Sequence, residues 1–116
     1  MRTDSGFRRV AWTLGMLAAC GAMQVRAADD VAAGKALYDR WCAACHAPGP
    51  GHPGTQALDA MYQGGTPAAL EERRNLDAAF VRYHVRHGRS TMPSFRKAEI
   101  SDQELEQITA YLTRPR

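Results

Sequence analysis

Apolar residues recur at helical spacing along the chain, and no segment shows the alternation that is typical of strands. The first periodic segment starts after Asp29 and Asp30, whose charges favour the positive end of a helix dipole, and it runs into residues 42–46. Its apolar positions are Val31, Ala32, Leu37, Tyr38 and Trp41. The pattern therefore predicts an all-α domain that opens with this helix.

The last predicted helix has the clearest terminal signals. Ser101 and Glu104 have the spacing of a capping box, in which each side chain accepts a hydrogen bond from the other residue's backbone. Ile100, just before the cap, can pack against Leu105 as a hydrophobic staple. The positions expected to face the core are Leu105, Ile108, Tyr111 and Leu112.

Two shorter helices are predicted between these two. Thr66 followed by Pro67 is typical of an N-cap and a first helical position, which predicts a short helix to about Arg73. Asp77 can cap another helix, which Gly88 would end in a left-handed conformation. One side of that helix would carry Phe80, Val81, His84 and Val85.

Long loops are predicted to join these helices. Residues 47–57 read APGPGHPGTQA, and their three prolines and three glycines cannot continue the first helix. Residues 89–99 read RSTMPSFRKAE and form a second predicted loop. About four short helices with such loops would need something further to pack against.

Residues 1–27 have the organisation of a secretory signal peptide. Three arginines near the start precede an apolar run over residues 10–23, and Val-Arg-Ala then ends in a small residue. The run is shorter than the roughly 20 apolar residues of a transmembrane span. We therefore predict a periplasmic domain over residues 28–116 with no transmembrane span. In the alternative, Cys20 in the lipoprotein-like sequence LAACG carries a lipid anchor.

Removal of this segment changes the charge of the chain. The sequence has 15 basic and 12 acidic residues, of which residues 1–27 hold four arginines and one aspartate. Residues 28–116 therefore hold 11 of each, and this neutral balance gives no indication of nucleic-acid binding. A domain this small often needs a metal, a disulfide or another staple to complete its core.

Both cysteines of residues 28–116 lie in the sequence CAACH, residues 42–46. A redox dithiol normally opens a helix after a strand, a zinc site needs four ligands, and a disulfide across so small a loop stabilises little. Cys42 and Cys45 are instead spaced to form thioethers with the two vinyl groups of haem, and His46 can then ligate the iron. The sequence predicts one covalently bound haem c.

The sixth iron ligand is a separate question. The candidates are His52, Met61, His84, His87 and Met92. Met92 lies in a loop between two helices, with Pro93 stiffening the backbone after it, and a thioether ligand raises the reduction potential. We predict Met92 as the distal ligand, with bis-histidine ligation as the alternative. We also expect a carbonyl of residues 50–53 to hold the second ring nitrogen of His46.

Basic side chains beyond the haem motif suggest two further roles. Arg82, Arg86 and Arg89 fall on one helical stripe, which we interpret as a solvated face or, alternatively, as a docking surface for an acidic partner. Arg96 and Lys97 follow the Met92 loop and could pair with a haem propionate.

The chain resembles the class I cytochromes c over nearly all of residues 30–113. The resemblance is carried by GKALYDRWCAACH, TMPSF and SDQELEQITAYL. It implies the cytochrome c fold, in which the first and last helices cross. Gly34 and Tyr38 would then pack against the region of Tyr111.

The same resemblance implies that His46 and Met92 are the axial ligands of the iron. A closer similarity is to the cytochrome subunits of the p-cresol methylhydroxylase family, which includes other 4-alkylphenol and eugenol-type hydroxylases. It is carried by GPGHPGTQAL, YQGGTPAALEERRNL and VRHGRSTMPSFRKAEISD. In that family the cytochrome docks on a separate FAD-containing dehydrogenase subunit.

The closer similarity implies an electron-transfer subunit that is not itself an enzyme. It would accept single electrons from an FAD-containing dehydrogenase subunit and pass them to a downstream redox carrier of the respiratory chain. One alternative is a free-standing periplasmic shuttle for another dehydrogenase or a terminal oxidase. A third hypothesis, a haem enzyme or gas sensor, requires a five-coordinate iron.

Overall fold

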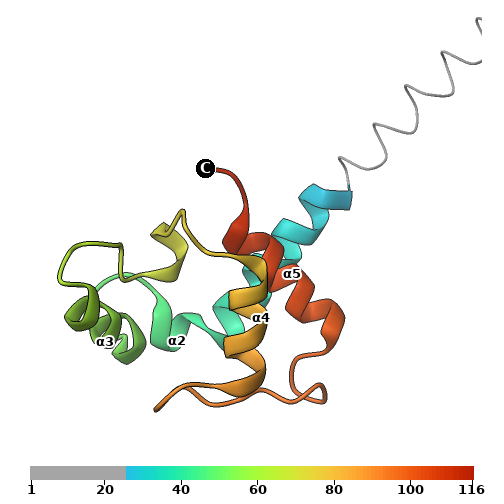
Figure 1. The fold of residues 1–116 in the computed structure, drawn as a ribbon. Coiled ribbons are helices and arrows are strands. Elements are labelled where there is room, and N and C mark those ends of the chain that lie inside the picture. Colours follow the sequence, from blue (N-terminus) through green and yellow to red (C-terminus); the bar gives the residue numbers. More distant parts are fainter. Residues whose placement is uncertain (1–25) are drawn as a thin grey trace, which may run out of the picture.

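The computed structural model describes residues 26–116 (Figure 1). Residues 26–41 are helical and are followed by α2 (Ala43–His46), α3 (Pro53–Tyr62), α4 (Ala78–His87) and α5 (Asp102–Thr113), with the 3-10 turn η1 (Leu70–Glu72) between α3 and α4. No strand is present among residues 26–116, so the all-α prediction is confirmed. The predicted signal segment, with Cys20, lies outside the described residues except for its last two positions, and it stays a prediction.

One apolar core joins helix 26–41, α4 and α5, which lie together in Figure 1. Its buried members are Tyr38, Val81, Val85, Ile100, Leu105, Ile108, Tyr111 and Leu112. The four positions predicted to face inward on α5 are all among them. On α4 the predicted face is only partly right, because Val81 and Val85 are buried whereas Phe80 is 46% exposed.

Helix 26–41 and α5 cross at Gly34, as the resemblance implied. A Cβ atom added at Gly34 would lie 1.9 Å from the carbonyl oxygen of Gln107 and 2.9 Å from Cβ of Tyr111. One turn further on, the rings of Tyr38 and Tyr111 pack with centroids 5.5 Å apart. The absence of a side chain at Gly34 therefore sets how closely the two helices approach.

The predicted helix starts are confirmed for the last two helices. The Ser101 hydroxyl accepts from the Glu104 N–H at 3.2 Å, and the Glu104 carboxylate accepts from the Ser101 N–H at 2.7 Å. Ile100 is fully buried and Leu105 nearly so, as a hydrophobic staple requires. The Asp77 carboxylate accepts from two N–H groups in the first turn of α4.

The helix α3 was not predicted, because its first turn lies in the proline- and glycine-rich segment that we expected to be a loop. Pro53 occupies the first helical turn, where the missing N–H has no partner to lose and the fixed φ already suits a helix. Gln63, in the left-handed conformation, ends the helix, and Gly64 continues the turn at a φ of 81°. The same proline that stops one helix thus starts the next.

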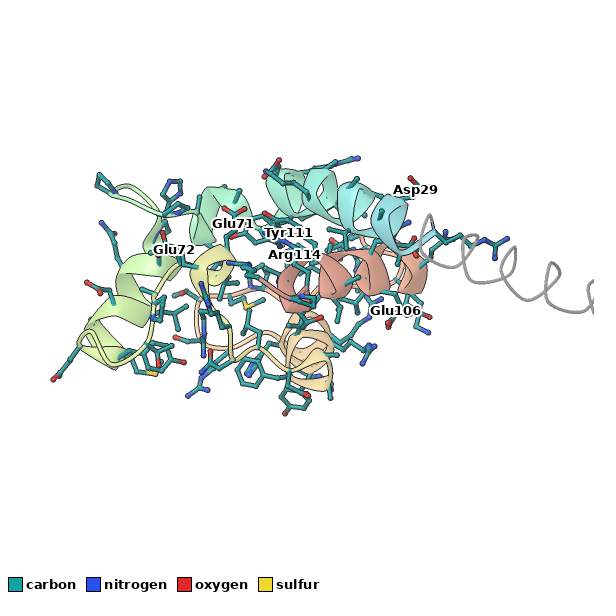
Figure 2. All side chains as sticks on the ribbon, turned by 90° about the horizontal axis from the view of Figure 1, so that it is seen from above. Asp29, Glu71, Glu72, Glu106, Tyr111 and Arg114 are labelled. Atoms are coloured by element: carbon teal, nitrogen blue, oxygen red, sulfur yellow. The ribbon has the colours of Figure 1, made fainter. Side chains whose placement is uncertain are left out.

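The prediction of a helix from Thr66 to Arg73 is wrong. Only the three residues of η1 are helical there, and the backbone of Ala69, directly before them, is extended. Ala69 is 3% exposed, and the Tyr111 hydroxyl donates a hydrogen bond to the Glu71 carboxylate; Figure 2 shows these two side chains together. Contacts with α5 therefore override the local N-cap signal.

Candidate haem-binding site

The helix α2 places three of the predicted site residues on one turn. Cys42 is its N-cap residue, and Cys45 and His46 lie within it. The N–H groups of Cys45 and His46 both donate to the Cys42 carbonyl, at 3.1 and 2.9 Å. Neither thiol is in a disulfide. The turn thus presents two free thiols and an imidazole in a fixed order.

Side chains from three different segments hold this turn in place. One donor is a hydroxyl on helix 26–41, the second is a histidine ring nitrogen just before α3, and the third is a hydroxyl on α3. Each donates to a different backbone carbonyl. The pairs are Tyr38 Oη to His46 O (3.0 Å), His52 Nδ1 to Ala44 O (3.1 Å) and Thr55 Oγ1 to Ala47 O (2.9 Å). Because carbonyls only accept, His52 carries its proton on Nδ1 here.

The two thiols differ in their surroundings. Cys42 is half-buried, and burial raises the pKa of its thiol to about 12, whereas Cys45 is exposed. A redox dithiol needs the opposite, a thiol whose pKa is lowered so that the thiolate can attack. Among residues 26–116 no group of three or more His, Cys, Asp or Glu side chains could hold a metal ion. These observations leave haem attachment as the interpretation that fits the pair.

The imidazole of His46 is held by packing. Its Nδ1 atom is buried and makes no hydrogen bond, so the expectation that a carbonyl of residues 50–53 would hold it is wrong. A Cβ atom added at Gly54 would lie 2.7 Å from Cε1 and 2.9 Å from Nδ1 of the ring. Burial lowers the pKa of His46, which favours the neutral ring that can bind iron.

Met92 lies in a tight turn against the end of α4. Its N–H and carbonyl exchange hydrogen bonds with Arg89, at 2.9 and 3.1 Å. Gly88 ends α4 as predicted, but its φ of 68° and ψ of −178° are not left-handed helical; only glycine adopts this combination readily. A Cβ atom there would lie 2.5 Å from the Met92 carbonyl oxygen. Met92 is half-buried against the core, whereas the rival Met61 is 53% exposed.

Two arginines of the predicted stripe join α4 to α5 and to the segment before it. Arg86 donates to the carbonyls of Phe95 and Ile100, at 3.0 and 2.8 Å, and to the Asp102 carboxylate at 2.9 Å. Arg82 forms a bidentate ion pair with the Glu106 carboxylate. The Arg86 side chain, 19% exposed, is therefore engaged within the domain rather than solvated, whereas Arg82 forms an exposed ion pair and the docking surface stays a prediction.

Replacing Arg86 by lysine is expected to destabilise the protein by about 2 kcal/mol, because the ammonium group of lysine cannot reproduce the planar guanidinium group, which donates to three acceptors. Denaturant unfolding followed by circular dichroism measures the change. Arg82→Lys is the matched control one turn away, where an exposed ion pair predicts little change. Equal losses in the two variants would contradict the role given to Arg86.

The half of the domain that contains α3 lacks a shared apolar core with the rest. The only buried residue of α3 is Thr55, and no residue of α3 belongs to the cluster that joins helix 26–41, α4 and α5. Its half-buried apolar side chains include Leu58 and Tyr62. Cys42 and Met92 pack against the edge of the main cluster. A large apolar group attached at α2 fits this division, since both parts of the domain would gain a partner.

Arg73 is a feature that the sequence analysis missed. It is 7% exposed, donates to Asn75 at 3.1 Å and to the Tyr62 hydroxyl at 3.3 Å, and takes part in none of the ion pairs between described residues. A buried cation is costly unless an anion accompanies it. Periodicity gave no signal for it, because an arginine between helices is expected on the surface.

The two residues predicted to pair with a propionate have other partners. Arg96 pairs with Glu99 and is 81% exposed, and Lys97 pairs with Asp102 and is 73% exposed. Both are thus solvated side chains with acidic neighbours in their own segment, unlike the buried Arg73.

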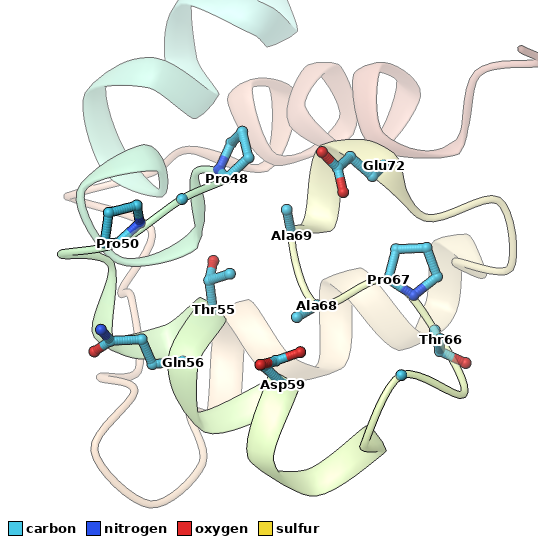
Figure 3. A pocket seen from close by; sticks show the side chains of 12 residues that line it. Pro48, Pro50, Thr55, Gln56, Asp59, Thr66, Pro67, Ala68, Ala69 and Glu72 are labelled. Carbon is cyan, nitrogen blue, oxygen red and sulfur yellow. The ribbon is translucent and has the colours of Figure 1, made fainter.

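A separate hollow of about 610 Å³ lies between α3 and the segment that leads to η1 (Figure 3). Figure 3 shows Asp59 and Glu72 facing it from two sides, with prolines and alanines between them. None of the four predicted site residues lines it. The hollow is therefore distinct from the α2 turn.

Known proteins share sequence similarity with most of this chain. Residues 29–112 match the family described as cytochrome C oxidase, cbb3-type, subunit III. The chain is 32% identical over 99 residues to the 4-cresol dehydrogenase [hydroxylating] cytochrome c subunit of Pseudomonas putida, covering 85% of this chain and 73% of that one. It is 34% identical over 87 residues to cytochrome c6 of Synechocystis sp., covering 73% and 65%. No solved structure matches.

The helical fold and the CAACH turn define a small c-type cytochrome domain. The chain belongs to the cytochrome c family, and its cofactor is covalently bound haem c. It is an electron carrier rather than an enzyme, as predicted. Since p-cresol and 4-cresol are one compound, the predicted similarity to the p-cresol methylhydroxylase cytochrome subunits is also confirmed. No helix among residues 26–116 has the length and apolar character to cross a bilayer.

Proposed function

We propose that this chain is the cytochrome subunit of a periplasmic flavocytochrome, which accepts single electrons from an FAD-containing 4-alkylphenol dehydrogenase subunit and passes them to a respiratory carrier. The observation that carries the proposal is the similarity to the 4-cresol dehydrogenase cytochrome c subunit along 85% of the chain. The similarity to cytochrome c6 supports the second candidate, a free-standing periplasmic shuttle.

The residues of the α2 turn and the Met92 loop fit the haem that this function requires. Cys42 and Cys45 would hold it through thioether bonds, and His46 and Met92 would be its axial ligands. When bound, the haem supplies reversible one-electron chemistry at its iron. The Tyr38 and Thr55 hydroxyls, which donate to carbonyls of the α2 turn, keep His46 fixed, and the turn at Gly88 keeps Met92 in place. With both axial positions filled, no site is left for a substrate, which suits a carrier.

The buried Arg73 completes this arrangement. A haem propionate is a carboxylate, and its pairing with the Arg73 guanidinium would remove the cost of an isolated buried cation. The Tyr62 hydroxyl, which accepts from Arg73, can donate its own proton to the same carboxylate. We place the propionate contact here in preference to Arg96 and Lys97.

Co-purification tests the proposed partner. Tagged cytochrome is recovered from its native periplasmic extract, the flavin content of the complex is measured, and 4-cresol is added. We expect an FAD protein to be retained and the haem to be reduced on addition of the phenol. A cytochrome recovered alone and monomeric, and not reduced by 4-cresol in the extract, would favour the free-standing shuttle.

Intact-mass spectrometry of the matured protein tests export and processing. We expect a chain that begins at Ala28 and carries the mass of one haem, because cleavage after Ala27 removes the basic and apolar leader. A Cys42→Ser, Cys45→Ser variant is the control and should lose the haem mass while keeping the same first residue. A chain that begins at a lipidated Cys20 would contradict the cleavage site.

A further inference from the structure

Trp41 lies at the junction between helix 26–41 and the turn that carries the two cysteines. It is the last residue of that helix and directly precedes Cys42, and its side chain is half-buried. Its ring meets the Phe95 ring edge-to-face, with centroids 5.9 Å apart, and both rings pack against the edge of the main core. The indole Nε1 atom is buried and makes no hydrogen bond, so packing rather than a hydrogen bond holds the ring.

Phe95 belongs to the segment that carries Met92 and follows it by three residues. Its N–H donates to the Val85 carbonyl at 2.8 Å, and its carbonyl accepts from Arg86 at 3.0 Å, so its backbone is tied to α4. Its ring instead contacts the first helix, through Trp41. Among the aromatic pairs of the described residues, this is the only one that joins the first helix to the Met92 segment.

We propose that Trp41 is a positioning residue for the axial methionine, and that its contact with Phe95 holds the Met92 segment at a fixed distance from the turn that carries the haem. Cys42 adjoins one ring of this contact, and Met92 lies near the other in the chain. A thioether is a soft ligand and binds oxidised iron weakly. Its retention therefore depends on being held beside the iron, where a fixed group outcompetes free ligands through its high effective concentration. The inference rests on the proposed ligation by Met92.

Imidazole titration of the oxidised holoprotein tests the positioning role, because free imidazole binds the iron only after it displaces Met92. For Trp41→Leu we expect imidazole to bind about fivefold more tightly, because the Met92 segment is less restrained. Trp41→Phe is the matched control: it keeps an aromatic ring and loses only an N–H that makes no hydrogen bond, so we expect less than about a twofold change. A folded Trp41→Leu holoprotein with unchanged imidazole affinity, or equal changes in the two variants, would refute the role.

Combined variants separate this contact from a general loosening of the domain. Phe95→Leu removes the other ring and should tighten imidazole binding to a similar extent. The double variant with Trp41→Leu should show little further change, because the two substitutions remove one contact. Effects that multiply instead would exclude the contact as the cause.

The Met92→Ala background separates the role of Trp41 from the proposed ligation. There Trp41→Leu should not change imidazole binding, since no methionine remains to be displaced, and a change would overturn the inference. If Met92→Ala alone leaves the imidazole affinity unchanged, the proposed ligation has failed, separately from the role of Trp41.

Nuclear magnetic resonance of the reduced, diamagnetic holoprotein checks the contact without any substitution. Trp41 is the only tryptophan of residues 28–116, so its indole resonances are assigned without ambiguity. We expect nuclear Overhauser effects between the ring protons of Trp41 and Phe95. Their absence would overturn the inference even if the leucine variants do not mature.

Discussion

Met92→Ala is expected to lower the reduction potential of the haem strongly. Loss of the soft thioether removes the ligand that favours the reduced iron, and we expect a shift of about a thousandfold in the reduction equilibrium, ~180 mV for one electron. Potentiometric titration of the purified holoprotein measures it. The reduced variant should also bind carbon monoxide rapidly, because one axial position has been opened.

Met61→Ala is the control for this prediction. Met61 is the other methionine that was considered as a ligand, and it is more than half exposed at the far end of α3. We expect the reduction potential and the visible spectrum of the Met61→Ala variant to match those of the unsubstituted protein. If Met92→Ala leaves both unchanged, Met92 is not the ligand, and a histidine such as His84 or His87 takes its place. Rapid carbon monoxide binding by the unsubstituted protein would instead support a five-coordinate iron.

The second large effect is on stability, at the crossing of helix 26–41 with α5. Glycine to alanine inside a helix normally stabilises by up to about 1 kcal/mol. At Gly34 the sign should reverse, because the new Cβ would overlap the Gln107 carbonyl and press on Tyr111. The helices would have to separate, and we expect a loss of about 3 kcal/mol in the free energy of unfolding.

Chemical denaturation of the holoprotein, followed by circular dichroism, measures the effect at Gly34. Ala36→Val on the exposed side of the same helix is the control, since it also enlarges a small side chain but meets solvent. We expect it to cost only the small helix propensity of a β-branched residue. Comparable losses in both variants would show that the crossing is not the cause.

Features that depend on neighbouring residues could be predicted from the sequence, whereas features that depend on contacts between distant segments could not. The starts of α4 and α5 were predictable because Asp77 and Ser101 bond to backbone groups two or three residues away. The Thr66–Pro67 signal has the same local form, yet that stretch is not helical, because η1 is fixed by Tyr111 from forty residues further along. Periodicity has no means of weighing such a contact.

The site shows the same division. The CAACH spacing placed two thiols and an imidazole correctly on one turn, since that depends only on helical geometry. The surroundings of His46 could not be predicted, because Gly54 approaches it from a helix that the proline-rich sequence concealed. Arg73 was overlooked for a related reason: it is buried and donates to Tyr62 of α3 as well as to the nearby Asn75, whereas charge alone argues for exposure.

The hydrogen bonds of Arg86 have a consequence for motion. One guanidinium joins α4 to two carbonyls on the chain between Met92 and α5, and the Phe95 N–H bonds back to the Val85 carbonyl. The Met92 segment therefore cannot detach while α4 and the start of α5 stay folded. Local opening, which usually begins in loops, would here require a larger cooperative unit to unfold. We therefore expect the loop that carries Met92, the proposed axial ligand, to exchange with solvent on the timescale of the core.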